Sequence, residues 1–385
     1  MENVYLKYYK QHHISPVAQD ISDIGLHYRK REKLYRQLGL PAIAFQNATI
    51  LEVGPGSGYN SLFFFQLGGY LDLVEPNPKG FADITALFSK CEISPNQYTL
   101  HACMAEDFKP DKTYDIIIAE GFLTHVDNGN EIIARLQKWV KPGGVIVVTC
   151  SDVVSLFVEQ MYRLAAHALT KDIEAYNDKV NVCAEFFQKG MKHLGGMSRS
   201  IEDWVRDNMF NPAFNSETII DIEKMIGLFG TDFEVLGSSQ KIFEDYSWYK
   251  DLAFEERENC ISQYRKKQHN FLMAGIAGTV WSEEENVKLR DIILKIRRNA
   301  ITYEIDFNET HLINIQKLLE EIIASDFRID GKINLFLAEC IGILDDVLHN
   351  IALVGEKYTM FGKVTGRGLQ YLSMVKDYKI KQIDL

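Results

Sequence analysis

Residues 48–65, ATILEVGPGSGYNSLFFF, constrain the fold more than any other part of this chain. A short apolar run leads into three glycines at alternate positions, Gly54, Gly56 and Gly58, and a second apolar run follows. Glycine serves where the main chain needs a positive φ or must approach another group closely. A strand that delivers such a turn into a helix also exposes backbone N–H groups. The pattern predicts a turn that holds a ligand with a carboxylate, ribose or phosphate group.

Short β-rich runs then alternate with helical runs, which is typical of a parallel sheet covered on both faces. The expected strands are 49–54, 71–76, 98–103, 114–121 and 144–150, with two more at 233–243 and 269–278. We therefore expect an α/β fold with a doubly wound, mostly parallel seven-stranded sheet. The expected organisation is a helical segment at 1–44, a sheet domain at 45–278 with a helical insertion at 151–215, and a helical region at 279–385.

Composition narrows the classes of function. Hydrophobic residues make up 46% of the 385 residues, which is ample for a large core, and the net charge of −11 disfavours binding to nucleic acid. The six cysteines are scattered without metal-ligand spacing, so a reducing compartment is favoured and no metal site is expected. The start of the chain lacks a signal-peptide pattern, and no apolar run approaches the roughly 20 residues that cross a bilayer. We expect a cytoplasmic protein that does not contact a membrane.

Two common phosphate-binding motifs do not fit. A dinucleotide turn needs Gly-x-Gly-x-x-Gly, and Tyr59 occupies the place of its third glycine. No Gly-Lys-Ser/Thr follows, which excludes a nucleoside triphosphate loop. Glu75 instead ends the next expected strand about twenty residues after the glycines, where an acidic group can accept hydrogen bonds from both ribose hydroxyls.

This combination resembles the class I, Rossmann-like methyltransferases that depend on S-adenosylmethionine, in a bacterial type with a helical insertion and a C-terminal helical extension. The matching residues are Glu52-Val-Gly54-Pro-Gly56-Ser-Gly58, the acidic end of the second strand, YDIII with Asp115, and LQKWVKPGG before the fifth strand. The resemblance implies S-adenosyl-L-methionine as the cofactor. It implies that Glu52 and the turn surround the methionine portion and that Glu75 binds the ribose. The cofactor-binding residues expected from it are Glu52, Gly54, Pro55, Gly56, Gly58, Glu75, Pro76, Met104, Ala105 and Glu120.

The adenine is expected near ACMAEDF, residues 102–108, where this chain departs from the family pattern. Many relatives have Asp-Ala where this chain has Met104-Ala105. The backbone of Ala105 is expected to recognise the adenine, with Met104 packed on the ring. Met104 as ordinary core is an equal alternative, and Glu106 is the less favoured replacement for the missing acid.

Two residues that follow the fourth strand are the catalytic candidates. His125 is the leading general base because the ordinary pKa of imidazole lies near neutrality. The alternative is that His125 caps or packs against the next helix. Glu120 could contact the methionine portion or the acceptor, or could be a structural carboxylate. No Asn/Asp-Pro-Pro-Tyr/Phe sequence follows the strand, which disfavours methylation of nucleic-acid bases.

Four residues are candidates for binding the acceptor, although ordinary structural roles compete with each prediction. Tyr28 and Arg29 could fold over the cofactor or belong to a solvated helix face. Arg199 and Trp204, in the insertion, suit a sugar or a carboxylated acceptor, with core packing of Trp204 as the alternative.

The expected activity is methyl transfer to an oxygen or nitrogen atom of a small molecule. The alternatives are an S-adenosylmethionine-binding scaffold that engages a protein partner and an aminopropyltransferase-like enzyme. The C-terminal helices are expected to be structural or to form a homo-oligomer.

Overall fold

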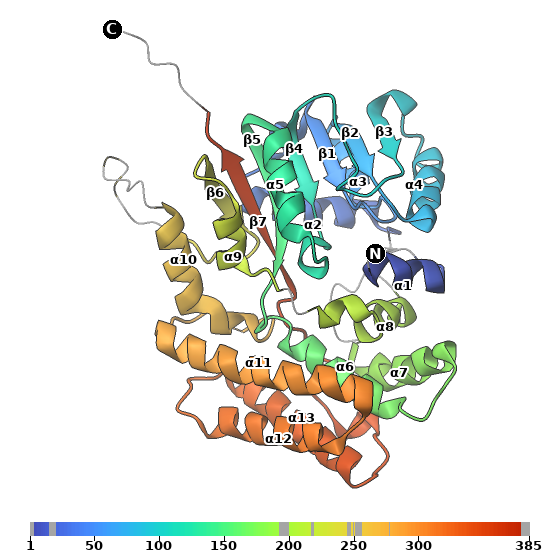
Figure 1. Ribbon diagram of the computed structural model, residues 1–385, viewed down its shortest axis with the longest axis vertical. Coiled ribbons are helices and arrows are strands. Elements are labelled where there is room, and N and C mark those ends of the chain that lie inside the picture. The colour runs from blue at the N-terminus through green and yellow to red at the C-terminus, as the bar shows by residue number, and fades with distance from the viewer. Residues whose placement is uncertain are drawn as a thin grey trace. The chain divides into compact units, whose positions relative to one another are not determined.

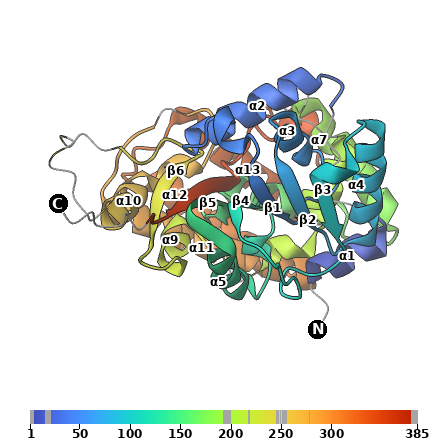
Figure 2. The same cartoon turned by 90° about the horizontal axis from the view of Figure 1, so that it is seen from above.

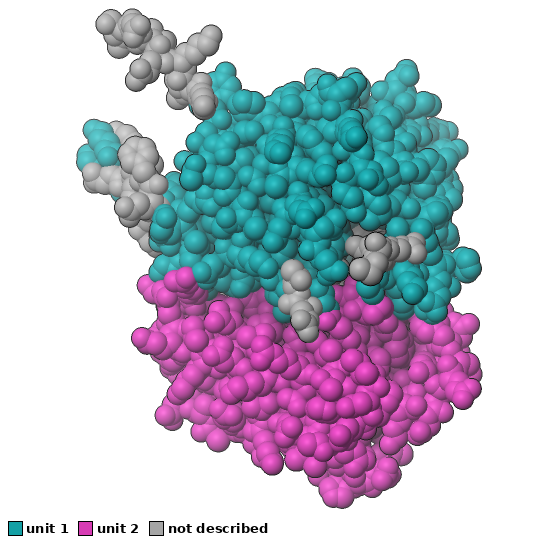
Figure 3. Space-filling view, viewed as in Figure 1, with its two compact units in different colours: residues 1–151, 216–264, 369–385 teal, residues 152–215, 265–368 magenta. Residues whose placement is uncertain are grey.

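The computed structural model describes residues 4–14, 21–191, 200–216, 219–244, 248, 250, 256–276 and 278–378. The chain divides into two compact units, coloured separately in Figure 3. Unit 1 comprises residues 1–151, 216–264 and 369–385, and unit 2 comprises residues 152–215 and 265–368.

Unit 1 contains a seven-stranded sheet with the order β3-β2-β1-β4-β5-β7-β6 (Figure 1). Its strands are β1 Thr49–Val53, β2 Tyr70–Val74, β3 Tyr98–His101, β4 Tyr114–Ala119, β5 Val140–Ser151, β6 Phe233–Ser238 and β7 Leu369–Lys376. The first five strands pair in parallel, and β7 lies antiparallel between β5 and β6. The predicted mostly parallel seven-stranded α/β fold is confirmed.

Helices cover both faces of this sheet because successive side chains of each strand point to opposite faces and both sets are apolar. Figure 2 shows α2 Ile24–Gln37 and α3 Ser61–Gln66 on one side, and α5 Gly129–Trp139 and α9 Ile222–Leu228 on the other. The first face forms one core cluster, which includes Tyr35, Phe45, Ile50, Phe63, Phe64, Leu71, Phe88, Ile116 and Val147. The remaining helices that begin in this unit are α1 Val4–His12, η1 Ala42–Phe45, α4 Pro78–Lys90, η2 Pro95–Gln97, η3 Leu123–His125 and α10 Glu256–Lys267.

Local sequence signals set the helix starts that matter for the site. Asp23 caps α2 by accepting a hydrogen bond from the N–H of Leu26. Asn77 caps α4 in the same way, and Pro78 occupies the first helical position, where its missing N–H costs nothing. Within the predicted helical segment 1–44, residues 24–37 thus form α2, and Gly39 follows this helix with a φ of 78°.

The prediction of a seventh strand at residues 269–278 is wrong. Residues 268–271 form a 3₁₀ helix, η5, and the seventh strand is β7, close to the end of the chain. Side chains supply the partners that a strand ladder would have supplied. The N–H of His269 donates to the side chain of Asn286, and the amide of Asn270 bonds both the carbonyl and the N–H of Thr279.

The division into units also differs from the predicted boundaries. The segment 1–44 belongs to the sheet unit, and the insertion after β5 groups with residues 265–368 to form unit 2. The region from 279 onward is helical only in part, because β7 returns the chain to the sheet. Sequence patterns near the end of the chain were dominated by long amphipathic helices, and the eight residues of β7 gave no comparable signal.

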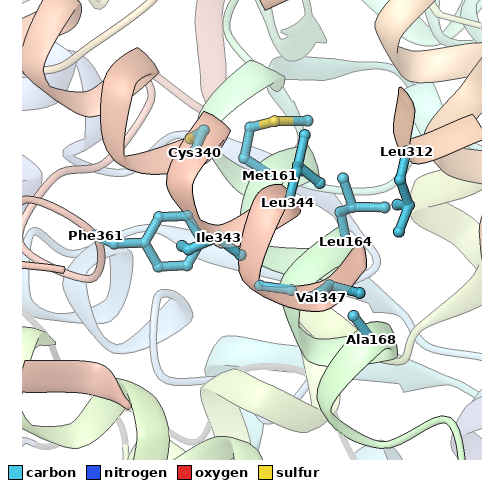
Figure 4. Close-up of a pocket in the computed structure, with 10 residues that line it drawn as sticks. Met161, Leu164, Ala168, Leu312, Cys340, Ile343, Leu344, Val347 and Phe361 are labelled. Atoms are coloured by element: carbon cyan, nitrogen blue, oxygen red, sulfur yellow. The ribbon is translucent and has the colours of Figure 1, made fainter. Parts of the chain in front are cut away.

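Unit 2 is helical. Its elements are α6 Phe157–Leu169, α7 Tyr176–Met191, α8 Ile201–Met209, η4 Pro212–Asn215, η5 Gln268–Phe271, α11 Glu283–Asp306, α12 Glu309–Ala324, α13 Gly331–Leu348 and η6 Gly355–Lys357. Buried polar contacts join α6 to α11, because Arg163 donates to both oxygens of Glu304 at 3.2 and 2.7 Å. A narrow apolar pocket runs between α6, α12 and α13 (Figure 4). Its lining offers no charged side chain that could anchor a polar ligand.

Three further features of the described residues concern the cysteines, the possible metal ligands and the lengths of the helices. All six cysteines are free of disulfide bonds, and four of them are buried. The described residues contain no group of three His, Cys, Asp or Glu side chains that could hold a metal ion. Within the described part of the chain, no helix has both the length and the apolar character needed to span a membrane.

The position of β7 generates a test of the fold. We expect a chain that ends at Gly368 to lose the folded sheet, because β6 then has no partner strand and β5 has an exposed edge. A chain that ends at Tyr378 keeps β7 and serves as the control. Circular dichroism and thermal unfolding of the two purified chains give the comparison, and a cooperative unfolding transition in the shorter chain would contradict the assignment.

Candidate functional site

The glycine turn lies directly beyond the carboxyl end of β1. Gly54, Gly56 and Gly58 have φ values of 71°, 60° and 77°, a region that residues with side chains adopt at a cost. The N–H of Gly54 continues the ladder by donating to the carbonyl of Val74 at 2.9 Å. A Cβ at position 54 would also lie 3.1 Å from the ring of Phe122. The turn is therefore restricted to glycine by both its conformation and its neighbours.

Glu75 follows β2 and is held by the glycine turn itself. One carboxylate oxygen accepts the N–H of Gly56 at 2.9 Å, and the other accepts the N–H of Asn77 at 2.8 Å. Burial raises the pKa of Glu75 to about 7, against the lowering effect of the two N–H groups. Each carboxylate oxygen has a second lone pair, so two further hydroxyl donors can be accepted.

Gly80 is a part of this arrangement that the sequence analysis missed. A Cβ at position 80 would lie 2.9 Å from the carbonyl oxygen of Gly56 and 3.1 Å from the carboxyl carbon of Glu75. The lack of a side chain thus lets the first turn of α4 approach the glycine turn. The available signal was the cap at Asn77-Pro78, which places Gly80 in that first turn.

Glu52, at the end of β1, is the second buried carboxyl group at this edge. It accepts a hydrogen bond from the hydroxyl of Ser61 at 2.6 Å. Burial raises the pKa of Glu52, the charge of Glu120 adds to this effect, and Ser61 and Arg31 oppose it, so that the pKa is about 7. The sequence predicted Glu52 and Glu75 at one edge of the sheet, and the structure brings them together there.

Glu120 follows β4, as predicted, but its carboxylate is already paired. Arg31 donates to its two oxygens at 2.7 and 3.0 Å, and the hydroxyl of Tyr35 donates at 2.6 Å. The side-chain amide of Asn60 completes the set at 3.5 Å. These bonds fit the alternative of a structural carboxylate, and a catalytic role for Glu120 gains no support from the geometry.

Arg31 and Tyr35 were not among the predicted site residues. The charge run around them suggested a solvated helix face, yet Arg31 is only 7% exposed and Tyr35 is fully buried. Their spacing of four residues places both on the inward side of α2. That spacing was the one signal in the sequence that could have identified them.

The segment after β3 lies beside Glu75, because the carbonyl of His101 accepts the N–H of Glu75 at 3.0 Å. Met104 and Ala105 begin the next turn, in which the carbonyl of Met104 accepts the N–H groups of Asp107 and Phe108. Ala105 is buried. One carboxylate oxygen of Glu106 is buried without a hydrogen-bond partner within the part of the chain that the structure describes.

The other predicted residues are more dispersed. The backbone of His125 ends η3, and its side chain lies outside the described residues. Tyr28 packs against Phe63 with ring centroids 6.4 Å apart. Arg29 is exposed and 4.0 Å from Asp23. Among the described residues, no hydrogen bond, ion pair or ring contact places Tyr28 or Arg29 over the glycine turn.

The two predicted acceptor residues of the insertion fall in or near unit 2. Arg199 lies outside the described residues. Trp204 packs edge-to-face on Phe187 and Tyr162, with ring centroids 5.5 and 6.1 Å apart. Trp204 thus makes aromatic contacts while staying partly exposed, and its predicted role in acceptor binding stays a prediction.

The chemistry of this edge is that of a site for a ribose-containing ligand with a charged portion. A backbone N–H group and a buried carboxylate meet at a turn in which every second residue is glycine, and the described residues contain no group of three His, Cys, Asp or Glu side chains that could hold a metal ion. The turn admits a ligand close to the main chain, and Glu75 retains acceptor capacity.

Comparison with known proteins finds a domain family and relatives that match part of this chain. Residues 26–187 match the model of a methyltransferase domain family. An uncharacterised protein, Rv1509, of Mycobacterium tuberculosis is 29% identical over 108 residues, which cover 28% of this chain and 37% of that protein. Phosphoethanolamine N-methyltransferase 3 of Arabidopsis thaliana is 28% identical over 104 residues, or 26% of this chain and 20% of that enzyme. The match therefore spans about a third or less of the length of these relatives.

Among solved structures, PKMT2 from Rickettsia typhi in complex with AdoHcy aligns with 58% of this chain and 46% of its own, at 18% identity and a TM-score of 0.40. The predicted family resemblance is confirmed by the matching family model together with the sheet and its glycine turn. Residues 26–187 of this chain therefore match a methyltransferase domain, and they include the first five strands of the mostly parallel sheet.

Proposed function

We propose that the protein is a methyltransferase that uses S-adenosylmethionine to methylate an oxygen or nitrogen atom of a small molecule. The observation that carries this proposal is the hydrogen bond from the N–H of Gly56 to Glu75, at 2.9 Å. It joins the glycine turn to an acidic group at the end of β2, so the two elements form one binding surface. A dinucleotide turn is disfavoured by Tyr59.

The residues at this edge fit the cofactor. Glu75 would accept the two ribose hydroxyls through its remaining lone pairs. The backbone of Gly54, Pro55, Gly56 and Gly58 would lie along the methionine portion, with Glu52 close to its ammonium group. Burial of both carboxylates favours a ligand that donates hydrogen bonds or carries positive charge, because such a ligand offsets the cost of ionising them.

The buried oxygen of Glu106 is a reason to revise the expected adenine contact. A buried acceptor without a partner costs about 1–3 kcal/mol, and a ligand amine would remove that cost. Glu106 would thus accept from the exocyclic amine of adenine, in place of the acid that relatives carry two positions earlier. Ala105 would contribute backbone contacts, as the sequence analysis predicted.

When bound, the cofactor supplies a methyl group on a sulfonium, which a nucleophile displaces in line. The contribution of the chain is to align the acceptor, since correct positioning can supply a large part of the rate enhancement. His125 is the proposed base for an acceptor that must lose a proton. Its backbone lies at the end of η3, which follows the carboxyl end of β4 within a few residues.

Fewer observations support the proposed class of acceptor than support the proposed cofactor. The plant relative is named for methylation of a small amine, which is consistent with a small acceptor but covers only 26% of this chain. The predicted sugar or carboxylate recognition relied on Arg199 and Trp204, and Trp204 packs among aromatic residues instead. The scaffold and aminopropyltransferase alternatives, and a homo-oligomer through the C-terminal helices, remain predictions to be tested.

Calorimetric titration of the full-length protein with S-adenosylhomocysteine tests the proposal, with NAD as the control. We expect micromolar binding of S-adenosylhomocysteine and none of NAD. Transfer of labelled methyl groups to a metabolite extract would then distinguish an enzyme from a scaffold. The absence of binding, or preferential binding of NAD, would contradict the proposed cofactor class.

Glu75 should make cofactor affinity depend on pH. The pKa of Glu75 is about 7, so its carboxylate becomes protonated as the pH falls from 8 to 6. Ribose hydroxyls donate hydrogen bonds to the ionised carboxylate, and protonation therefore weakens their binding. We expect affinity for S-adenosylhomocysteine to fall several-fold from pH 8 to pH 6. Glu75→Ala should weaken binding at pH 8 by at least about tenfold, or 1.4 kcal/mol, and should make the pH dependence shallower.

Glu52 titrates in the same range, so a residual slope is expected in this variant. Glu92→Ala, at an exposed position after α4, is the matched control and should leave the titration unchanged. An affinity that is independent of pH in the parent protein, or unchanged by Glu75→Ala, would reject the ribose assignment.

The proposed base is tested by His125→Ala. We expect turnover to fall by roughly 10²-fold or more while the affinity for S-adenosylhomocysteine stays within about twofold, because the side chain acts on the acceptor rather than on the cofactor. Steady-state kinetics with an identified acceptor and calorimetry give the two values. Equal turnover in variant and parent would remove His125 from the mechanism.

A further inference from the structure

A buried polar network joins α2 to the carboxyl edge of the sheet. Its centre is the ion pair between Arg31 and Glu120, whose side chains are 9% and 11% exposed. The hydroxyl of Tyr35 contacts both partners at 2.6 Å. Tyr371 of β7 faces the same pair, and burial raises the pKa of its phenol to about 12, with the charge of Glu120 as the next cause. Helix α2, the segment after β4 and strand β7 therefore meet at the carboxylate of Glu120.

Stability alone is a poor explanation for this network. Burying an ion pair costs desolvation free energy that its attraction often fails to recover, and apolar replacements of such pairs are often neutral or stabilising. The Nε–H of Arg31 adds to the cost, because it is buried and has no hydrogen-bond partner within the described residues. Because this N–H group is unsatisfied, the free energy of folding alone does not explain why a guanidinium occupies this position.

The chain that follows Glu120 connects the network to the glycine turn. Gly121 has a φ of 83°, and its N–H donates to the hydroxyl of Thr149 at 2.8 Å. The next residue is Phe122, whose ring lies against Gly54, 3.1 Å from where a Cβ of that glycine would be. A shift of Glu120 would thus move an aromatic ring that packs on the first glycine of the turn.

The same pair acts on the neighbouring carboxyl group. Glu52 is faced by Ser61 from α3, Glu120 beyond β4, Arg31 from α2 and Glu75 beyond β2. Arg31 offsets the effect of Glu120 on Glu52, so loss of the guanidinium alone would leave two carboxylates facing each other. The network thereby influences both the shape and the charge of the edge at which the cofactor is proposed to bind.

We propose that Arg31 is a positioning residue for the cofactor site, which holds Glu120 and thereby fixes Phe122 on the glycine turn. This inference rests on the proposed function, since the ligand whose binding it supports is S-adenosylmethionine. Arg31 itself is assigned no contact with the cofactor. It acts through the Glu120-Gly121-Phe122 segment, and Glu120 changes from a catalytic candidate to the anchor of that segment.

The test compares three variants of the full-length protein by thermal unfolding and by calorimetric titration with S-adenosylhomocysteine. Arg31→Met leaves Glu120 buried without its partner, and we expect both a lower unfolding temperature and at least tenfold weaker binding. The double variant Arg31→Met/Glu120→Gln removes both charges. We expect its unfolding temperature to return close to that of the parent, with binding still at least fivefold weaker.

Arg36→Met is the matched control on the same helix, because Arg36 is exposed and, among the described residues, its guanidinium pairs with the partly exposed Glu32 at 3.4 Å. It should change neither measurement. Recovery of parental affinity in the double variant would overturn the positioning role, since affinity would then simply follow stability. Failure of the parent protein to bind S-adenosylhomocysteine would overturn the proposed function and this inference together. The parent protein thus tests the proposed function, and the double variant tests the positioning role.

Discussion

The hydrogen bonds that converge on Glu75 hold the candidate site together. Its carboxylate receives the N–H of Gly56 from the turn after β1 and the N–H of Asn77 from the start of α4, so two βα connections are fixed to one side chain. A buried carboxylate needs such donors, because an unpaired charge in this environment would be protonated. Gly80 follows from the same requirement, since a side chain there would separate the carbonyl of Gly56 from Glu75, whereas the glycines at 54, 56 and 58 allow the positive φ values of the turn.

Buried carboxylates recur along this edge, and each is stabilised differently. Glu75 is bonded by backbone N–H groups, Glu52 by a single hydroxyl, and Glu120 by a guanidinium and a phenol. The pKa values of Glu52 and Glu75 are about 7, whereas Glu120 is held by the direct ion pair. Glu52 and Glu75 can therefore accept further hydrogen bonds near neutral pH, whereas the oxygens of Glu120 already accept hydrogen bonds from Arg31 and Tyr35.

Much of this arrangement could be predicted from the sequence, because it depends on residues that are close in the chain or repeat in a regular pattern. The glycine spacing indicated the turn, and the distance to Glu75 indicated an acidic group at the next strand end. The error at residues 269–278 had a local cause. Their apolar composition suggested a strand, but the side chains of Asn286 and Asn270 accept the backbone N–H groups of His269 and Thr279 without a neighbouring strand. The role of Glu120 was left open for a related reason, since its partner Arg31 is 89 residues away.

The sequence by itself determined the class of fold and the surface on which a nucleoside-containing ligand is expected, because strand alternation and glycine spacing act over short distances. Only the tertiary structure decided that β7 completes the sheet, that Trp204 packs among aromatic residues, and that Glu120 pairs with Arg31 and Tyr35. These outcomes depend on which distant groups meet when the chain buries its apolar surface. A buried charge must find a partner wherever the fold provides one, and the position of that partner in the chain is not encoded in any local pattern.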